Sequence, residues 1–305
     1  MQLLQLQAGM QAGQGLRKEF SPTFKAETER RIMINIVSVG SSSSGNSYII
    51  MTESRTVLID AGLPAKTIIG ALEHLGTDPA DVDAVLITHE HVDHVKSVRA
   101  ISRKCCNAFF YASRGTVEST PNFCHVPQER IVLLSAGEIV RIDNDDDMEI
   151  GAFPLSHDAA EPLGFTVTSG GEKLAIVTDT GVVSEEIYAA VRDADLLVFE
   201  ANHDVDMLMF GEYPYPVKVR IKGDKGHLSN DYAGEVLSYI LSDRKERQAQ
   251  DPLRIMLAHL SFHNNAPLFA RQTVEDALGA AGFHKGEDYL LDVAAKEGLS
   301  FMPEL

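Results

Sequence analysis

A chain of 305 residues is long enough for one large domain or two small ones. Hydrophobic residues make up 44% of it and charged residues 23%, which is ordinary for a globular protein, and no apolar run is long enough to cross a membrane. The formal net charge of −17 argues against broad, nonspecific binding to nucleic acid, although it leaves room for a local basic groove.

The N-terminal residues 1–32 are rich in Gln and Gly at first and charged afterwards, and they lack the apolar segment of a signal peptide. We expect them to be a peripheral extension of a hydrolase domain formed by residues 33–305. The three cysteines, Cys105, Cys106 and Cys124, form no Cys-x-x-Cys pair. They are therefore expected to be reduced packing residues of a cytoplasmic protein.

Apolar runs and their spacing predict the elements of the domain. Strands are predicted at 33–39, 48–51, 56–59, 84–88, 108–112, 131–143, 148–155, 163–168, 174–177, 195–199, 253–257 and 288–293. Helices are predicted at 64–75, 93–105, 113–119, 183–191, 229–242 and 266–281, the fifth capped by Ser229 or Asn230. The strands form antiparallel-looking pairs, and helices follow several of them. This order predicts an α/β chain in which two sheets are sandwiched between helices.

Two polar loops allow more than one interpretation. The loop at 40–46 has the sequence Gly-Ser-Ser-Ser-Ser-Gly-Asn. It is either a flexible hairpin or a cradle of backbone N–H groups for phosphate, with Ser44 and Asn46 as candidate contacts. The acidic run at 143–147 lacks the spacing and the helices of an EF-hand, so we expect a solvated turn between two strands.

The strand at 84–88 leads directly into the sequence His89-Glu90-His91-Val92-Asp93-His94. Histidines at positions i and i+2 of an extended segment point to the same side, so His89 and His91 can share one ion. Asp93 and His94 follow where the chain turns into a helix, which can aim them at a neighbouring ion. Three imidazoles and a carboxylate suit zinc or a similar divalent metal. The alternative is a set of surface histidines on a polar loop.

This motif resembles the signature of the metallo-β-lactamase superfamily, and the resemblance implies a four-layer αββα fold. Further ligand candidates, each directly after an apolar strand, are His157, Asp179 and His259. Each could be structural if taken singly. The superfamily order implies that one ion is held by His89, His91 and His157, and the second by Asp93, His94 and His259, with Asp179 bridging the two. It also implies a catalytic role for Asp93 and a supporting role for Asp60 behind the ligand loop.

A bridging carboxylate has a physical purpose in such a site, because it relieves the repulsion between two nearby cations. Water held between two such ions loses a proton near neutral pH, and we expect the resulting hydroxide to be the nucleophile. The expected cofactors are two divalent ions, Zn²⁺ or Mn²⁺, with iron as a further option.

Two further stretches of the sequence resemble motifs of the nuclease branch of the superfamily. Glu200 ends an apolar strand, and His227 lies in Gly226-His227-Leu228-Ser229 at a helix entrance. The resemblance implies that Glu200 orients His227 and that His227 donates a proton to the leaving oxygen. A sugar alkoxide is a poor leaving group, so a general acid has a clear task in cleaving a phosphodiester. Alternatively, His227 only enters the helix and Glu200 is a surface charge.

Four cations precede His227, namely Lys218, Arg220, Lys222 and Lys225. The first three alternate, so on a strand they would share one face and could line a phosphate track. The alternative is a solvated charged face. Asn202 and His203 could touch the substrate or a metal, and the sequence leaves their role open.

Residues 33 to about 285 resemble the YycJ/WalJ-type group of metallo-β-lactamase-fold hydrolases. The matching stretches are 41–46, 88–94, 156–162, 178–181, 200–204, 226–229, 258–261 and 264–265. The resemblance implies an exonuclease that degrades DNA from 5′ ends. Twenty residues separate Asp179 from Glu200, so the long inserted domain of RNase J-like enzymes is absent.

The sequence therefore predicts a two-metal phosphodiesterase, a 5′→3′ DNA exonuclease with a nucleic acid substrate and no membrane partner. The rival function is a metallohydrolase of small esters, lactones or thioesters. A metal-stabilised binding protein is disfavoured by the complete ligand set. The sequence does not indicate the native metal or an oligomeric state.

Overall fold

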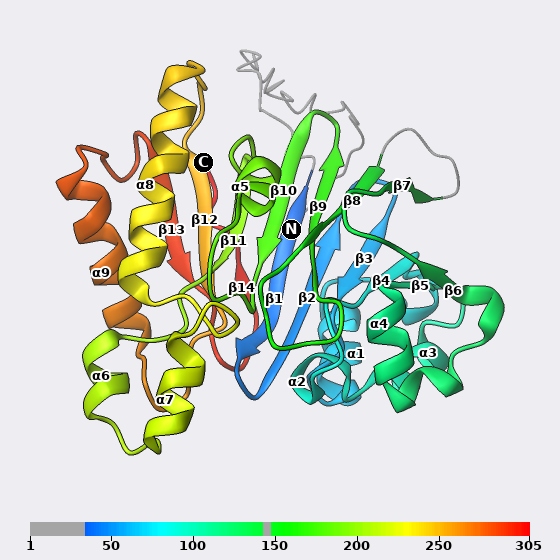
Figure 1. The fold of residues 1–305 in the computed structure, drawn as a ribbon. Helices are drawn as coiled ribbons and strands as arrows, with labels where there is room; N and C mark the ends of the chain where they lie inside the picture. Colours follow the sequence, from blue (N-terminus) through cyan, green and yellow to red (C-terminus); the bar gives the residue numbers. More distant parts are fainter. Residues whose placement is uncertain (1–33, 143–147) are drawn as a thin grey trace, which may run out of the picture. The chain divides into compact units, whose positions relative to one another are not determined.

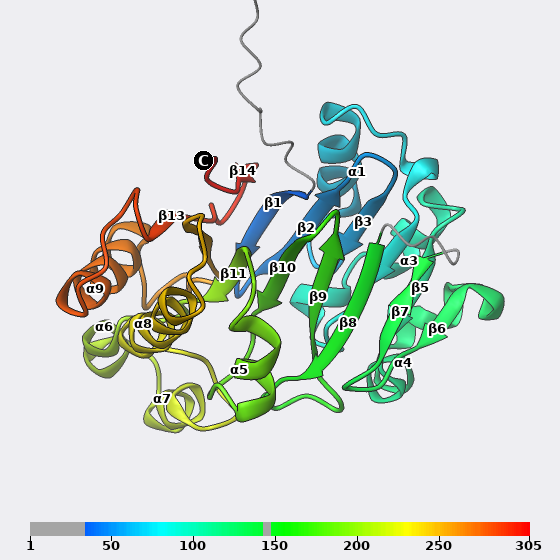
Figure 2. The same ribbon diagram turned by 90° about the horizontal axis from the view of Figure 1, so that it is seen from above.

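The computed structural model describes residues 34–142 and 148–305. In this part of the chain, two seven-stranded sheets lie face to face, and helices cover the outer face of each sheet (Figures 1 and 2). This arrangement confirms the predicted sandwich. The N-terminal extension and the acidic run at 143–147 lie outside the described residues, so the domain boundary at residue 33 stays a prediction.

The first sheet has the strand order β14-β1-β2-β3-β4-β5-β6. Neighbours from β14 to β3 are antiparallel, and those from β3 to β6 are parallel. The strands are Asn35–Ser42 (β1), Gly45–Met51 (β2), Thr56–Ile59 (β3), Ala84–Leu86 (β4), Phe109–Ala112 (β5), Ile131–Leu133 (β6) and Ser300–Phe301 (β14).

The second sheet has the order β13-β12-β11-β10-β9-β8-β7. Its pairs from β7 to β10 are antiparallel, and those from β10 to β13 are parallel. The strands are Ile139–Arg141 (β7), Met148–Pro154 (β8), Leu163–Ser169 (β9), Glu172–Val177 (β10), Leu196–Glu200 (β11), Leu253–Ala258 (β12) and Tyr289–Val293 (β13).

Polar side chains begin several of the helices. The hydroxyl of Ser229 accepts a hydrogen bond from the backbone N–H of Tyr232 and so caps α8, as predicted, and Asp204 caps α6 in the same way. The helices are Ala65–His74 (α1), Val92–Val95 (α2), Val98–Lys104 (α3), Arg114–Ser119 (α4), Glu185–Val191 (α5), Val205–Phe210 (α6), Tyr215–Lys222 (α7), Asn230–Glu246 (α8) and Pro267–Ala280 (α9). Short 3₁₀ helices lie at Pro79–Asp81, Pro121–His125 and Gln128–Arg130.

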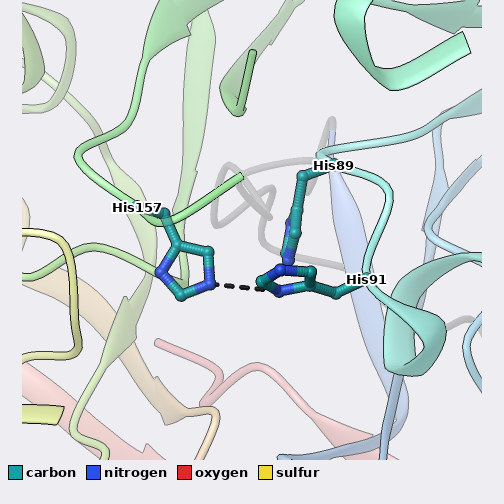
Figure 3. Close-up of side chains that lie close together, drawn as sticks. All are labelled: His89, His91 and His157. Atoms are coloured by element: carbon teal, nitrogen blue, oxygen red, sulfur yellow. Dashed lines mark hydrogen bonds between the residues drawn. The ribbon is translucent and has the colours of Figure 1, made fainter. Parts of the chain in front are cut away.

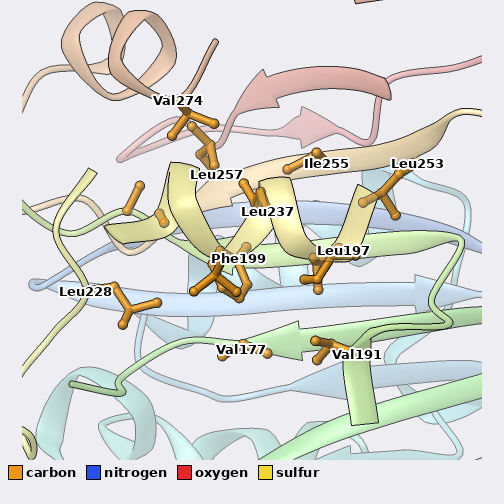
Figure 4. Packing of buried hydrophobic residues seen from close by; sticks show 14 of the residues in the cluster. Val177, Val191, Leu197, Phe199, Leu228, Leu237, Leu253, Ile255, Leu257 and Val274 are labelled. Atoms are coloured by element: carbon orange, nitrogen blue, oxygen red, sulfur yellow. The ribbon is translucent and has the colours of Figure 1, made fainter. Parts of the chain in front are cut away.

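Three buried clusters of apolar side chains hold the four layers together. One lies between the two sheets and includes Tyr48 and Phe165. A second packs the first sheet against α1 and α3. The third joins the second sheet to α5, α8 and α9, with Phe199 from the sheet and Leu237 from α8 (Figure 4). Burial of these side chains on both faces explains why the central strands are continuously apolar in sequence.

The structure corrects several predicted elements. The helix predicted at 93–105 is broken into α2 and α3, and the strand predicted at 131–143 is two strands in different sheets, separated by Gly137 at φ 88°. The segment 215–222 is the helix α7 and not a strand, so the predicted shared face of its cations is wrong. The chain also contains α6 and β14, which the sequence did not predict.

The cysteine prediction holds only in part. All three cysteines are free, but Cys105 alone is buried, and the prediction that Cys106 and Cys124 are packing residues is wrong. Within the described ranges, no helix is both long and apolar enough to cross a membrane.

The parallel strands of both sheets end at the same edge of the sandwich. In the first sheet, β3 leads to Asp60 and its parallel neighbour β4 leads to the segment 88–94. In the second sheet, β10, β11 and β12 are parallel and lead to Asp179, Glu200 and His259. The carboxyl ends of parallel strands commonly carry the binding groups of an α/β protein. This edge therefore collects the polar side chains that the sequence placed after apolar strands.

Candidate metal centre

The structure brings all seven predicted ligand side chains together at this edge. Ligand atoms within 4.8 Å of one another form overlapping groups: His89, His91 and His157; His89, His94 and Asp179; Asp93, His94 and His259; and Asp179, Glu200, His227 and His259. The first and third groups are the two triads that the sequence assigned to separate ions. Their proximity is what a two-ion site requires, while the assignment of each residue as a ligand remains a proposal.

The first triad faces a common point between the two sheets. Nε2 of His157 lies 3.3 Å from Nδ1 of His91, and the ring of His89 stands edge-on to both (Figure 3). The Nδ1–H of His157 donates to the backbone carbonyl of Gly226 at 3.2 Å. This bond leaves the lone pair of Nε2 directed at the other two rings.

Asp179 lies between the two triads. Its Oδ2 is 3.3 Å from Nε2 of His94, and its Oδ1 is 3.3 Å from Nε2 of His259 and 3.8 Å from Nε2 of His157. Nε2 of His94 is also 3.4 Å from a carboxylate oxygen of Asp93. A carboxylate with its two oxygens directed at both triads is suited to bridge two cations.

The chemistry of the buried atoms fits a metal. Three ligand atoms at the centre have no hydrogen-bond partner although they are shielded from solvent, namely Nε2 of His89, Nε2 of His259 and Oδ2 of Asp179. Leaving such atoms unpaired is costly unless another group satisfies them. Imidazole nitrogens and carboxylate oxygens converging in this way are donors for Zn²⁺, Mn²⁺ or iron.

Asp60 lies behind the ligand loop and is hydrogen-bonded to it. Its carboxylate accepts hydrogen bonds from Nδ1–H of His94 at 2.7 Å and from the backbone N–H of Thr88 at 2.9 Å. The hydroxyl of Thr88 also donates to this carboxylate and lies 3.0 Å from Nδ1 of His89. The network fixes both rings through their Nδ1 atoms, so that Nε2 of each ring faces the ligand cluster. The sequence did not predict this role for Thr88, although Thr88 directly precedes the motif.

The backbone at the site is locally strained. Asp60, Asp179 and His259 have φ values of 59°, 62° and 56°, in the left-handed region that side chains with a Cβ rarely adopt. Each follows the last residues of a strand, so the turn redirects the side chain toward the cluster. The backbone at Gly62 passes very close to that of Asp93. A Cβ at position 62 would lie 1.5 Å from the carbonyl oxygen of Asp93, so only glycine fits there.

Glu200 lies behind the second triad with its side chain fully buried. Its Oε1 accepts from Nδ1–H of His227 and from Nδ1–H of His259, each at 2.8 Å. Its Oε2 accepts from the backbone N–H groups of Thr180 and Leu228. The carboxylate is thus satisfied by four donors and is not a surface charge, which excludes the alternative that the sequence left open for Glu200.

Burial and mutual charge shift several pKa values. Burial disfavours the ionised form of Asp93, yet the adjacent His94 and His259 rings hold the pKa of its carboxyl far below the usual range. Burial likewise opposes protonation of His259, but the carboxylates of Asp179, Asp93 and Glu200 outweigh it and raise its pKa to about 10. Without metal, the nearby carboxylates therefore favour a protonated ring at His259.

The Ser/Gly loop supports the site in a way that the sequence did not foresee. The hydroxyl of Ser41 accepts from the backbone N–H of His259 at 2.8 Å. The fully buried Asn46 bonds to Ser42 and lies 3.2 Å from Nε2 of His94, so its prediction as a phosphate contact is wrong. Ser44 is exposed, but its backbone N–H already donates to the hydroxyl of Ser42.

The predicted substrate contacts separate into buried and exposed residues. Asn202 is buried and donates to the carbonyl of His259, which makes it a brace and corrects its prediction as a substrate contact. His203 is also buried; burial lowers its pKa to about 4, and its Nδ1 has no partner. The His203 side chain is therefore enclosed by protein, which argues against a direct contact with substrate.

The four cations before His227 are not equivalent. Lys218 donates to the carbonyls of Met209 and Gly211, so it closes the end of α6, and its role as a phosphate contact stays a prediction. Arg220 is exposed and pairs with Asp158, whose other oxygen is 3.4 Å from Nε2 of His157. Lys222 and Lys225 are exposed. Arg220 is therefore the predicted cation that the structure ties to the first triad.

Two sheets between helical layers, with histidines and carboxylates gathered at their parallel ends, define a metal-dependent hydrolase of the metallo-β-lactamase fold. The chain belongs to the beta-lactamase superfamily, whose domain model matches residues 55–245. It is 34% identical over 252 residues to exodeoxyribonuclease YycJ of Bacillus anthracis, covering 82% of this chain and 91% of the relative.

Exodeoxyribonuclease WalJ of Streptococcus pneumoniae is also 34% identical, over 251 residues, covering 82% of this chain and 90% of that protein. Among solved structures, the metallo-β-lactamase-fold protein YhfI of Bacillus subtilis superposes with a TM-score of 0.63 over 88% of this chain and 99% of that one. Its sequence identity is 14%, so this likeness supports the fold alone.

Proposed function

We propose that this protein is a two-metal phosphodiesterase that removes nucleotides from the 5′ ends of DNA. The observation that carries the proposal is the hydrogen-bonded pair of the buried Glu200 and the partly exposed His227 beside the ligand cluster, with Nδ1 of His227 3.9 Å from Oδ1 of Asp179. Hydrolysis of an activated ester needs a general acid less than cleavage of a phosphodiester does, because a sugar alkoxide is a poor leaving group. The relatives named exodeoxyribonucleases support the same choice.

The ligand roles follow the two triads. His89, His91 and His157 would hold one ion, Asp93, His94 and His259 the other, and Asp179 would bridge them. Bound divalent ions would supply an activated water and stabilise the negative charge that develops on the phosphate. Zn²⁺ and Mn²⁺ are the expected ions.

The proton on the leaving side comes from His227. Its Nδ1–H donates to Glu200, so the ring orientation is fixed and Nε2 is the atom that carries the transferable proton. The side chain of His227 is 16% exposed, while that of Glu200 is fully enclosed. The histidine can therefore meet a substrate oxygen, while the carboxylate can act only through the rings it holds.

Exposed cations supply the expected phosphate contacts. Arg220 is 58% exposed and is held near the first triad by Asp158. A substrate phosphate can compete for this guanidinium, because Arg binds carboxylates and phosphates with the same geometry. Lys222 and Lys225 extend the positive charge of this face toward His227.

The test is digestion of a duplex DNA carrying a label at either the 5′ or the 3′ end of one strand, with Mn²⁺ or Zn²⁺ added to the purified protein. We expect immediate release of labelled mononucleotide from the 5′ label and a ladder of shortening products from the 3′ label. The reverse pattern would refute the polarity. If the protein hydrolyses a thioester or lactone but digests no nucleic acid, it is a small-molecule metallohydrolase and the nuclease proposal is wrong.

A further inference from the structure

An aromatic cluster lies outside the machinery described above. The ring of His263 contacts Phe262 at a centroid distance of 5.2 Å and Tyr213 at 5.7 Å, each in an edge-to-face arrangement. Phe262 is 61% exposed, and His263 is exposed as well. Edge-to-face packing holds the rings in fixed orientations. A ligand that stacks on their exposed faces therefore loses little binding free energy to the ordering of these side chains.

The cluster adjoins the metal centre. Phe262 lies three residues after His259 in a segment tied to the site on both sides. The backbone N–H of Ser261 donates to the carbonyl of Asn202, and Leu260 bridges to Ser42 of the Ser/Gly loop. Tyr213 comes from the turn between α6 and α7, helices that lie at the same end of the sheets as α2 (Figure 1). The loops that carry these rings therefore lie at the end of the sheets where the ligand cluster is found.

Positive charge accompanies the rings. Nζ of Lys296 lies 4.7 Å above the ring of Phe262 and donates to the carbonyl of the same residue at 3.2 Å. The Phe262 ring can stack on a flat apolar group, and the Lys296 ammonium can pair with a negative charge. Together they suit a ligand that carries both features. A nucleotide is such a ligand, since every base has a π face and every link a phosphate.

We propose that Phe262, His263 and Tyr213 form a stacking platform for the bases of the substrate strand, and that Lys296 contacts a phosphate of that strand. This inference rests on the proposed function and specifies it: the site accepts a strand whose bases are unpaired near the reacting phosphate. Stacking needs no base-specific hydrogen bond, so the platform grips a strand of any sequence.

The experiment compares two duplexes with the same 5′ overhang. In one duplex the overhang carries bases, and in the other it carries abasic tetrahydrofuran sites with all phosphates kept. For the wild-type holoenzyme, kcat/KM should be on the order of 5- to 100-fold higher on the overhang with bases. Phe262→Ala and His263→Ala should each bring this ratio toward one. Tyr239→Ala removes an equally exposed aromatic ring on α8, with Tyr239 59% exposed, and should keep the wild-type ratio.

The outcomes separate this inference from the proposed function. If wild-type protein digests DNA and Phe262→Ala keeps the preference for bases, the platform is refuted while the nuclease assignment stands. If the wild type digests no nucleic acid, the proposed function fails and the platform fails with it. A dimer in sedimentation that Phe262→Ala converts to a monomer, without a change in the ratio, would identify the surface as a contact between copies and overturn the proposal.

Discussion

The carboxylate of Glu200 accepts a hydrogen bond of 2.8 Å from Nδ1 of His259, and its same oxygen holds Nδ1 of His227 at an equal distance. One buried side chain thus orients both a proposed metal ligand and the proposed general acid. Both rings donate through Nδ1, so each presents Nε2 to the site. We therefore expect metal binding at His259 and proton donation by His227 to be coupled through the carboxylate of Glu200.

Replacing the general acid should separate proton transfer from metal binding. We expect His227→Ala to keep the metal content of the wild type while kcat on DNA falls by roughly 10²–10⁴-fold. Metal analysis and turnover on the same preparation measure both quantities. Asp179→Ala is the matched control, and it should lose metal, because its carboxylate faces both triads. Loss of metal from His227→Ala would show that His227 is a ligand.

Glu200→Ala should affect both functions at once. Removal of the carboxylate leaves the rings of His227 and His259 without their acceptor, so the second ion should bind more weakly and kcat should fall. Titration with metal shows the first effect, and turnover at saturating metal shows the second. A variant whose defect is fully restored by added metal would contradict the shared role, because Glu200 would then serve His259 alone.

The close approach at Gly62 can be tested by adding one methyl group. In Gly62→Ala the new Cβ would meet the carbonyl of Asp93, so the turn at 92–94 must move, at a cost of about 1–3 kcal/mol in the free energy of unfolding. Metal affinity should fall as well. Gly70→Ala on α1 is the control, since nothing lies within 4 Å of its Cβ and helix propensity favours alanine. Equal melting temperatures for the two variants would argue against a required close approach.

Metal affinity should depend on pH in a defined direction. In the metal-free protein, burial is outweighed by nearby carboxylates, so the pKa of His94 is raised well above its usual value and that of His259 to about 10. Both rings then hold their protons at neutral pH, and an ion must displace them. Affinity should rise as pH rises toward the folded pKa values and weaken as pH falls. Calorimetry in buffers of different ionisation enthalpy should record net proton release, and proton uptake would contradict this account.

The sequence alone predicted the ligand candidates that the structure brings together. His89 to His94 follow an apolar strand, and the remaining candidates end later strands, so the pattern of buried runs located them before any contact was known. Local spacing also predicted most strands, because burial on both faces leaves continuous apolar segments. The same local rules failed at 215–222, where alternating cations suggested a strand and the chain forms α7.

Only the tertiary structure decided how distant segments meet. The sharing of Glu200 by His227 and His259 depends on the parallel register of β11 and β12 and on the entry into α8. The link from Asp60 through Thr88 to His89 depends on the pairing of β3 with β4. The ring contact between Tyr213 and His263 likewise joins two loops that no spacing rule connects. Sequence periodicity reports which face of an element is buried, whereas the partner across the interface is fixed by the packing of whole layers.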